Sequence, residues 1–403
     1  MDLKGGYPFW SVKNGLLAAF PRLQGEHEVD ALIIGGGITG ALIARQLALS
    51  GLRIALVEKR DIAWGSTSAS TALLQYEIDT EMRDLAEQYG EPDAAQAYLA
   101  CAYSVGEVLK IAKSFPGVEG FPLESLYFAS RFWHATRLRK EHAMRVKHGI
   151  EVSLLEGVEL KRRFGLDAPV GLLSKVAGAV DPYQLTYAIL SKLQKSGAAI
   201  HDKTEMTSFK NFKNGVSADF DNGAKVHCKH LVMACGYESQ NFIEQRVADN
   251  RSSYAFVTDP QEGPLERLED TMVWESARPY LYLRRTQDRR LLVGGEDDAL
   301  DIAAKRDLLI PRKVKKMRDK LEKMYPQHNW QPAFAWAGTF AETKDGLPFF
   351  GPHQQHGPHV HFAMAYGGNG ITYSQLGAEI FAATLNGKTH PLKKLFGFER
   401  LAR

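Results

Sequence analysis

The sequence contains few cysteines, and it has neither a long apolar run nor a large excess of either charge. Its 403 residues include three cysteines, Cys101, Cys228 and Cys235, which are widely spaced and form no C-x-x-C motif. This pattern argues against a disulfide framework and favours a reducing compartment, so we expect a cytoplasmic protein. No apolar stretch approaches the ~18 residues of a transmembrane helix, and the apolar run at residues 16–20 is too short for a signal peptide.

The balance of charges excludes another class of partner. Lys and Arg number 50 against 47 Asp and Glu, which leaves a formal net charge of +3. That excess is too small to indicate binding to nucleic acid or to an acidic membrane surface. Apolar residues make up 44% of the chain, so we expect a globular protein with a sizeable core that acts on a small molecule.

Residues 29–60 (VDALIIGGGITGALIARQLALSGLRIALVEKR) have the order of elements of a nucleotide-binding unit. The apolar run at 29–34 is typical of a buried parallel strand, and helical periodicity follows at 41–49. A second strand at 53–57 leads to an acidic residue, and the pattern G-x-G-x-x-G separates the first strand from the helix. This order predicts dinucleotide binding. The alternative is a glycine-rich turn in an ordinary βαβ unit.

The glycines of the motif each have a physical purpose. Gly35 permits a tight turn, Gly37 leaves room for a pyrophosphate beside backbone N–H groups, and Gly40 lets the helix pack on the strand. The N-terminus of the helix, which Ile38 and Thr39 precede, offers unpaired N–H groups and partial positive charge to the phosphates. We therefore count all five residues as candidate cofactor contacts.

The acid at the end of the second strand is Glu58, 18 residues after Gly40. A carboxylate at this place accepts hydrogen bonds from the ribose hydroxyls of an adenosine. It also disfavours a ribose that carries a 2′-phosphate. Lys59 follows directly and is counted with the cofactor site, although a solvated position is the alternative.

Residues 64–77 (WGSTSASTALLQYE) change abruptly from hydroxyl to aliphatic side chains. With this segment, the sequence resembles FAD-dependent oxidoreductases of the D-amino-acid oxidase, glycine oxidase and sarcosine oxidase type, over nearly the whole chain. The resemblance implies that Ser66 and Thr67 contact the phosphate and ribityl groups through their hydroxyls. It also implies that Thr71, Ala72 and Leu73 lie against the isoalloxazine ring. The alternative is a Ser/Thr cluster that opens an ordinary helix, and both readings can hold because a helix N-terminus suits phosphate too.

Two more segments extend the resemblance toward the adenosine. A helix at 182–195 precedes a strand and a turn, and the resemblance implies that the backbone at Met206 meets the adenine. The run HLVMACGYES is a buried strand ending at Gly236, with Cys235 where relatives have threonine. A small buried residue is the usual interpretation of this cysteine, and a catalytic thiol is the alternative.

The C-terminal part resembles the flavin end of the same family. A strand at 360–366 leads through glycines into a helix at 371–385, which ends before Gly387. The resemblance implies that the N-terminus of this helix stabilises negative charge on the pyrimidine of reduced flavin. The candidate contacts are Gly368, Asn369, Gly370, Ile371 and Thr372. A glycine-rich turn without a ligand is the alternative.

These assignments predict an α/β fold with an α+β second domain. The Rossmann-like FAD-binding domain is discontinuous and comprises residues 28–85, 150–245 and 335–403. The substrate domain comprises residues 86–149, mostly helical in pattern, and 246–334. The latter contains two strand-like runs joined by a polar turn, so we expect an antiparallel sheet that roofs the flavin.

The substrate side is defined by one of these strands. Alternation places Tyr280, Tyr282 and Arg284 on one face. The resemblance implies that Tyr282 falls near a tyrosine that contacts substrate in several relatives, so we select Tyr282 and Arg284 as candidate substrate contacts. A packing role for the tyrosine is the alternative. Phe340 occupies the place of the arginine that binds the substrate carboxylate in glycine oxidase-like members, so a carboxylate would need another anchor, such as Arg278 or Arg284.

Two other departures concern the flavin. Leu292 stands where sarcosine oxidase-like members have the lysine that activates oxygen, so fast reaction with oxygen is not implied. No cysteine occurs in residues 236–403, so we expect FAD to be bound non-covalently.

Three remaining motifs receive ordinary structural interpretations. Residues 353–361 (HQQHGPHVH) suggest a metal site, but carboxylate and cysteine partners are missing nearby, so we expect no metal. The acids of GGEDD at 294–298 are expected at a solvated strand end. Residues 305–323 form a basic amphipathic pattern typical of an exposed helix, with contact to a membrane surface as the alternative.

The predicted function is oxidation of a C–N bond in an amine or amino acid, with hydride transfer to flavin N5. Oxygen, a quinone or another compound would accept the electrons. One alternative is a dehydrogenase of a hydroxy acid or polyol phosphate. The other is an FAD-binding electron-transfer protein without catalysis.

Overall fold

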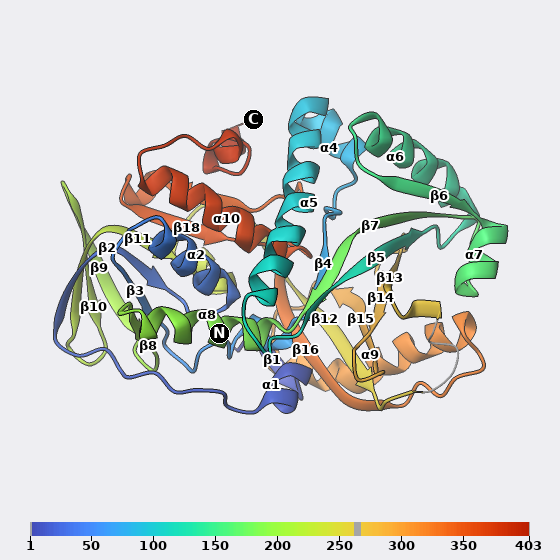
Figure 1. Ribbon diagram of the computed structural model, residues 1–403, viewed down its shortest axis with the longest axis horizontal. Coiled ribbons are helices and arrows are strands. Elements are labelled where there is room, and N and C mark those ends of the chain that lie inside the picture. The colour runs from blue at the N-terminus through green and yellow to red at the C-terminus, as the bar shows by residue number, and fades with distance from the viewer. Residues whose placement is uncertain (1, 262–266, 403) are drawn as a thin grey trace.

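The computed structural model describes residues 2–261 and 267–402, and two sheets lie side by side in it (Figure 1). In the described residues the smaller sheet has eight strands, in the order β17-β18-β11-β2-β3-β8, with β10 and β9 extending from β11. Its strands are β2 (Glu26–Ile34), β3 (Ile54–Val57), β8 (Ala199–His201), β9 (Met206–Phe212), β10 (Gly215–Phe220), β11 (Lys225–Met233), β17 (Phe349–Pro352) and β18 (Val360–Met364).

The centre of the smaller sheet is parallel, as the apolar run at 29–34 predicts. Strands β18, β11, β2, β3 and β8 all run in the same direction. Ala31, Leu32 and Ile33 are fully buried because helices cover this sheet. The helices that pack together here are α2 (Ile38–Leu49), α8 (Pro182–Lys195) and α10 (Gly370–Leu385). Helices α8 and α10 begin within one residue of the starts expected from the sequence. Helix α2 begins three residues before its expected start.

The larger sheet has ten strands among the described residues, in the order β1-β16-β12-β15-β14-β13-β5-β7-β4, with β6 paired to β7. Its strands are β1 (Lys4–Gly6), β4 (Leu73–Gln75), β5 (Gly120–Phe128), β6 (Val152–Glu156), β7 (Val170–Val180), β12 (Asp249–Thr258), β13 (Thr271–Glu275), β14 (Leu281–Arg285), β15 (Leu291–Asp298) and β16 (Pro332–Glu342). Pairing is antiparallel except between β13 and β5.

Helix α9 (Ala303–Met324) packs against β12, β15 and β16 of the larger sheet. Its apolar stripe, Val314, Met317 and Leu321, is buried in one cluster with Leu283 and Val293 of the sheet. The basic amphipathic pattern thus forms an exposed helix with a buried stripe. The remaining helices include α1 (Phe9–Asn14), α3 (Ser66–Ala69), α4 (Met82–Tyr89), α5 (Glu91–Lys113), α6 (Ala135–Lys147) and α7 (Gly157–Phe164).

The two sheets do not coincide with the two sets of domain segments expected from the sequence. Strands β4, β6 and β7, and most of β16, fall within 28–85, 150–245 or 335–403, yet they belong to the larger sheet. The segment 86–149, expected to be mostly helical, contributes β5 to the same sheet. An apolar strand can bury its side chains in either sheet. The apolar pattern of a strand therefore does not identify the strand with which it pairs.

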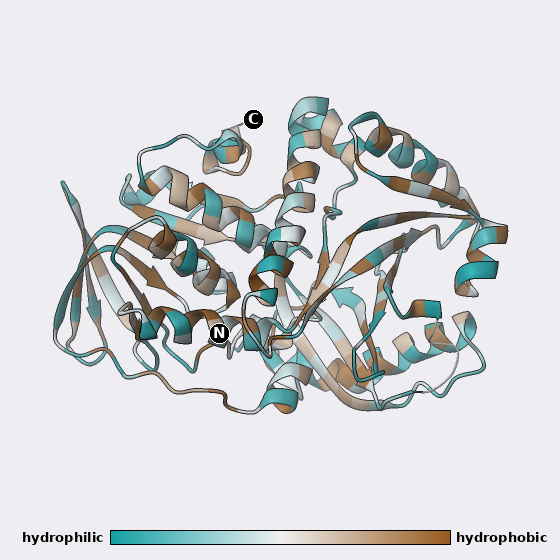
Figure 2. Ribbon diagram, viewed as in Figure 1, coloured by the Kyte–Doolittle hydropathy of each residue, from teal (hydrophilic) through white to brown (hydrophobic). Residues whose placement is uncertain are grey.

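One apolar cluster joins the two sheets. It contains Ile33 and Leu56 from the smaller sheet together with Ala255, Leu292 and Trp336 from the larger one. Helix α5 stands between the sheets in Figure 1 and contacts both α10 and β7. Figure 2 shows apolar residues along the central strands of both sheets. In the part of the chain that the structure describes, no helix combines the length and apolar character needed to cross a membrane.

Candidate cofactor and substrate site

A cavity of ≈ 330 Å³ lies between the two sheets. On one side it is lined at the carboxyl ends of β2, β3 and β11, and on the other by residues of β12, β14, β15 and β16. The carboxyl ends of parallel strands are the usual place for ligands in such sheets. The cavity therefore brings the nucleotide motif and the predicted roof to one site.

The glycine turn is too crowded for any other residue. A Cβ atom on Gly40 would lie 1.9 Å from the carbonyl oxygen of Gly35, and one on Gly35 would lie 2.2 Å from that of Ala234. Gly35 also has φ of +119°, which favours glycine. The N–H of Ile38 donates to Thr67 Oγ1 (3.0 Å), which joins the start of α2 to the Ser/Thr-rich segment.

Glu58 is held at the end of β3 by backbone donors. Its Oε2 accepts from the N–H of Gly36 (2.8 Å) and its Oε1 from the N–H of Arg60 (2.8 Å). Burial raises the pKa of this carboxyl, and the two hydrogen bonds oppose that rise. The Nζ of Lys59 and the guanidinium of Arg60 both pair with Glu238, at 3.1 and 2.9 Å. The cations at this end of the cavity thus already have carboxylate partners.

The segment 64–77 crosses from one sheet to the other. It contains the four-residue helix α3, and Ala72 then adopts a left-handed conformation with φ of 55° before β4 begins. Thr71 is held from the larger sheet: its carbonyl oxygen accepts from Nε (3.3 Å) and Nη2 (3.2 Å) of Arg284, and its Oγ1 donates to Tyr282 Oη (3.3 Å). Among the described residues, the buried Oγ of Ser66 finds no hydrogen-bond partner.

The opposite end of the cavity is aromatic. Tyr280 and Tyr282 have ring centroids 5.7 Å apart, and a Cβ atom on Gly294 would lie 2.3 Å from the ring of Tyr282. Trp274 stacks on Tyr127 with centroids 3.8 Å apart. Phe340, which the sequence resemblance places at the carboxylate-binding arginine of glycine oxidase-like members, also lines the cavity. The three aromatic lining residues Trp274, Tyr280 and Tyr282 form what we call the aromatic end.

The turn between β18 and α10 closes the cavity from the smaller sheet. The N–H of Gly368 donates to Asp79 Oδ2 (2.8 Å), and Thr372 Oγ1 donates to the carbonyl oxygen of Gln75 (3.2 Å). Asn369 donates through its side-chain amide to the carbonyl oxygen of Glu77. These contacts fix the N-terminus of α10 against the segment that follows β4.

Most residues selected from the sequence meet at this cavity. Those that line it are Gly35, Gly37, Ile38, Thr39, Glu58, Lys59, Ser66, Thr67, Thr71, Ala72, Leu73, Met206, Gly236, Gly368, Gly370, Ile371 and Tyr282. Four lie outside its lining: Gly40, Asn369, Thr372 and Arg284. Arg284 is on the same face of β14 as Tyr282, as the alternation predicts, but it is buried under the carbonyl of Thr71 rather than directed at the cavity.

Four lining residues with carboxyl groups were not selected from the sequence: Asp79, Glu205, Glu238 and Asp297. Asp79 lies between β4 and α4, and Asp297 lies near the end of β15, where solvated acids were expected. Burial raises the pKa of Asp297 to about 7, and its Oδ1 has no hydrogen-bond partner in the described residues. The sequence signal that could have drawn attention to it is the pair Gly294–Gly295, because glycines inside a strand often mark a bulge.

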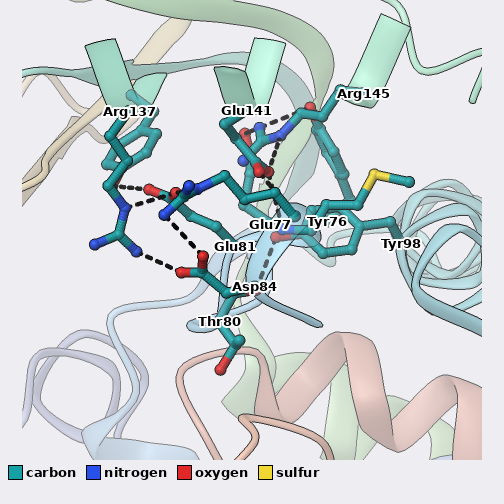
Figure 3. A network of polar contacts seen from close by, with 12 residues as sticks. Tyr76, Glu77, Thr80, Glu81, Asp84, Tyr98, Arg137, Glu141 and Arg145 are labelled. Atoms are coloured by element: carbon teal, nitrogen blue, oxygen red, sulfur yellow. Dashed lines mark hydrogen bonds and ion pairs between the residues drawn. The ribbon is translucent and has the colours of Figure 1, made fainter. Parts of the chain in front are cut away.

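A network of buried charges holds the segment that carries Asp79 (Figure 3). Arg145 donates from Nε to Glu141 Oε1 (2.8 Å) and from Nη1 to Tyr76 Oη (3.1 Å). Glu141 also accepts from the N–H of Met82 (3.0 Å) at the start of α4. The network therefore anchors both ends of residues 76–82 to α6.

Comparison with known proteins identifies the cofactor. The model of the family described as FAD dependent oxidoreductase matches residues 30–384. The chain belongs to this family. Its cofactor is FAD, and the α/β class with a Rossmann-like FAD-binding fold and a substrate domain, predicted from the sequence, is confirmed.

Several relatives of this oxidoreductase match more than nine-tenths of its length at about 20% identity. γ-Glutamylputrescine oxidoreductase of Escherichia coli is 22% identical over 396 residues, which cover 94% of this chain and 88% of that protein. The structure of L-proline dehydrogenase from P. horikoshii aligns with a TM-score of 0.78 and 19% identity, over 94% of this chain and 99% of that one. Glycine oxidase from Geobacillus kaustophilus aligns with a TM-score of 0.75 and 20% identity, over 92% and 98%. These structures share the fold.

The residues of the oxidoreductase fit FAD. Gly37, the N-cap residue of α2, lines the cavity without a side chain, so a pyrophosphate can approach the start of this helix. The unpaired Oγ of Ser66 lies beside this turn on the same cavity and can donate to a phosphate oxygen. Glu58 at the end of β3 suits ribose hydroxyls. The cavity thus contains polar groups suited to a pyrophosphate and to a ribose.

The cysteine that lines the cavity of the flavoprotein keeps its proton. Cys235 lines the cavity, but burial raises the pKa of its thiol far above the usual range, and its Sγ lies 3.4 Å from the carbonyl oxygen of Ile34. A thiol that keeps its proton is a poor nucleophile. In the described residues no three His, Cys, Asp or Glu side chains are grouped to hold a metal ion.

Proposed function

We propose that this oxidoreductase oxidises a C–N single bond of an amine or amino acid to an imine, which water then hydrolyses. FAD, when bound, supplies the chemistry by accepting a hydride at N5. The residues of the larger sheet form the substrate half of the molecule, and those of the smaller sheet form the nucleotide half. Related proteins with the names γ-glutamylputrescine oxidoreductase, glycine oxidase and L-proline dehydrogenase support this reaction class.

The chain's own residues have two tasks in this reaction. The smaller sheet binds the dinucleotide through the glycine turn, Glu58 and the Ser66–Thr67 pair. The N-terminus of α10 at Gly370 and Ile371 offers N–H groups and a partial positive charge, which stabilise negative charge on a reduced ring. Thr71 and Ala72 lie between this turn and the aromatic end, where a flat ring would be enclosed and water excluded.

The observation that carries the proposal is that no lysine or arginine lines the aromatic end of the cavity in the described residues, since Arg278, 4.8 Å from the ring centroid of Tyr280, lies outside the lining. Among the described residues that line the cavity, the cations are Lys59 and Arg60, and both pair with Glu238 beside the nucleotide motif. A phosphate or a hydroxy-acid carboxylate needs a cationic partner when it is desolvated. This favours amine oxidation over the oxidation of a polyol phosphate, a reaction class to which other relatives belong: α-glycerophosphate oxidase of Streptococcus pyogenes is 55% identical over 56 residues, 14% of this chain.

The test is anaerobic reduction of the bound flavin. The purified protein is mixed with a panel of amines, amino acids, hydroxy acids and polyol phosphates, and the loss of oxidised-flavin absorbance is followed. We expect reduction by at least one amine or amino acid, with a product imine trapped as its hydrolysed carbonyl compound. Reduction by hydroxy acids or polyol phosphates alone would contradict the proposal.

A further inference from the structure

Two carboxyl groups lie at the aromatic end of the cavity, where the described lining residues include no lysine or arginine. The guanidinium of Arg278 lies outside this lining, 4.8 Å from the ring centroid of Tyr280. Asp79 accepts one hydrogen bond from Gly368 and lines the cavity. Asp297 lines the same cavity, with its Oδ1 unpartnered in the residues that the structure describes. The lining residues contributed by the larger sheet include no lysine or arginine within the described chain. The substrate end of the cavity is therefore acidic as well as aromatic.

A bulge in β15 directs Asp297 into the cavity. Tyr254 of β12 pairs with Gly295, whereas Ser252 pairs with Asp298, so β15 has one extra residue in this interval. Glu296, at the bulge, adopts a left-handed conformation with φ of 56°. Such an insertion turns the following side chain to the opposite face of the strand. Without it, Glu296 would face the cavity, and Asp297 would face α9.

The two neighbouring acids consequently have opposite environments. Glu296 faces α9, where its carboxylate lies 2.9 Å from Lys320 Nζ and 3.5 Å from Lys316 Nζ. Asp297 meets no such cation. Burial is the main cause of its raised pKa of about 7, the charges of Asp79 and Glu342 add to it, and a hydrogen bond with Ser253 and the charge of Arg278 oppose it. Desolvated carboxyl groups of this kind are stabilised by a cationic ligand.

We propose that Asp297 and Asp79 bind the ammonium group of the substrate, and that the preferred substrate is an amine without a carboxylate on its reacting carbon. The proposal rests on the proposed C–N oxidation and specifies its substrate class. An ammonium offers three donors, which suit two carboxylates. The rings of Trp274, Tyr280 and Tyr282 attract a cation as well. An amino acid would bring its carboxylate toward Asp79 and Asp297, and like charges in a desolvated site repel.

The test uses ligands that cannot be oxidised, so that binding is measured apart from turnover. 2-Phenylpropan-2-amine, 2-phenylpropan-2-ol and 2-amino-2-phenylpropanoate have the same ring and no hydrogen on the reacting carbon. The first is a cation, the second is neutral and the third adds a carboxylate. Their dissociation constants are measured from the shift in absorbance of the FAD-loaded protein, with calorimetry as a second readout.

We expect the amine to bind at least about tenfold more tightly than the alcohol or the amino acid, as one charge-assisted hydrogen bond would provide. Asp297→Asn should abolish this preference and leave binding of the alcohol unchanged. Asp301→Asn is the matched control, because Asp301 is exposed and accepts a hydrogen bond from Asn250 (2.8 Å) away from the cavity. That variant should keep the preference.

The pH dependence provides an independent check. Because Asp297 loses its proton near pH 7 while the amine stays charged, the dissociation constant of the amine should fall about tenfold from pH 6 to pH 8. The polar and charged groups that act on Asp297 are Ser253, Asp79, Glu342 and Arg278, and the charge of Asp297 acts in turn on Tyr282. In Asp297→Asn the dissociation constant should not change with pH over this range.

The outcomes separate this inference from the proposed function. Equal binding of the three ligands, no binding of the amine, or an unaltered preference in Asp297→Asn would overturn the inference. If amino acids reduce the flavin and amines do not, the inference fails while C–N oxidation stands. If neither class reduces the flavin but a hydroxy acid does, the proposed function itself fails.

Discussion

Arg145 is a buried cation whose removal should destabilise the protein strongly. Its side chain is 1% exposed, and its partners Glu141 and Glu77 are 0% and 1% exposed. Its Nε lies 2.8 Å from Glu141 Oε1, and its Nη1 lies 3.6 Å from Glu77 Oε1. Arg145→Met keeps the apolar stem and removes the charge, so that two carboxyl groups remain buried without their cation. Breaking a buried pair in this way costs about 3–5 kcal/mol.

Arg137 provides the matched comparison within the same network. It also joins two carboxylates, Glu81 at 2.7 Å and Asp84 at 2.8 Å, but its side chain is 50% exposed. An exposed pair contributes about 0–1 kcal/mol. For a chain of 403 residues, the entropy of unfolding is roughly 0.8 kcal/mol/K. A loss of 4 kcal/mol then lowers Tm by about 5 °C in Arg145→Met, against about 1 °C in Arg137→Met.

The assay is thermal unfolding of the FAD-free protein, followed by far-ultraviolet circular dichroism. Adding Glu141→Gln to Arg145→Met should restore part of the lost Tm, because it removes one of the unpaired charges. A Tm for Arg145→Met equal to or higher than that of Arg137→Met would show that burial does not set the cost, and would refute the reasoning.

Three further predictions concern the site. Glu58→Gln should raise the dissociation constant of FAD at least about tenfold in a fluorescence titration, because charged hydrogen bonds contribute about 1.5–3 kcal/mol; an unchanged value would contradict the ribose assignment. Denaturation should release FAD and leave a chain at its own mass of 44.9 kDa, so an added flavin mass would contradict non-covalent binding. Because the folded-state pKa of Asp297, about 7, exceeds its ordinary value, its buried carboxyl costs stability as pH rises from 4 to 7. In the FAD-free protein, Asp297→Asn should therefore gain Tm relative to wild type at pH 8 and not at pH 4, and an equal difference at both pH values would count against the raised pKa.

The sequence predicted the nucleotide side of the molecule closely. Strand β2, the turn at Gly35–Gly40 and helix α10 were all recognisable, because each combines an apolar period with glycine at a position that requires it. The family comparison confirms the FAD cofactor and the enzyme class. The assignment of single residues to FAD atoms stays a prediction, although most of those residues line one cavity.

The substrate side was less predictable because local patterns do not contain its geometry. Alternation correctly grouped Tyr280, Tyr282 and Arg284. The arginine is nevertheless covered by groups far away in the chain, among them the carbonyl of Thr71, 213 positions away, and the ring of Trp10. At the end of β15 the bulge exchanges the faces of Glu296 and Asp297. A strand with strict alternation would have given the opposite assignment, and nothing in the local hydropathy distinguishes the two acids.

The apolar cluster that spans both sheets has a consequence for how the protein can be divided. Ile33 and Leu56 of the smaller sheet share it with Ala255 and Trp336 of the larger one, and the chain passes between the sheets several times. A fragment containing only one sheet would expose the apolar faces that the other covers, so neither half could be inherited or exchanged as an autonomous folding unit. The reaction site would then evolve by changes within an indivisible whole, not by joining a nucleotide-binding module to a new substrate module.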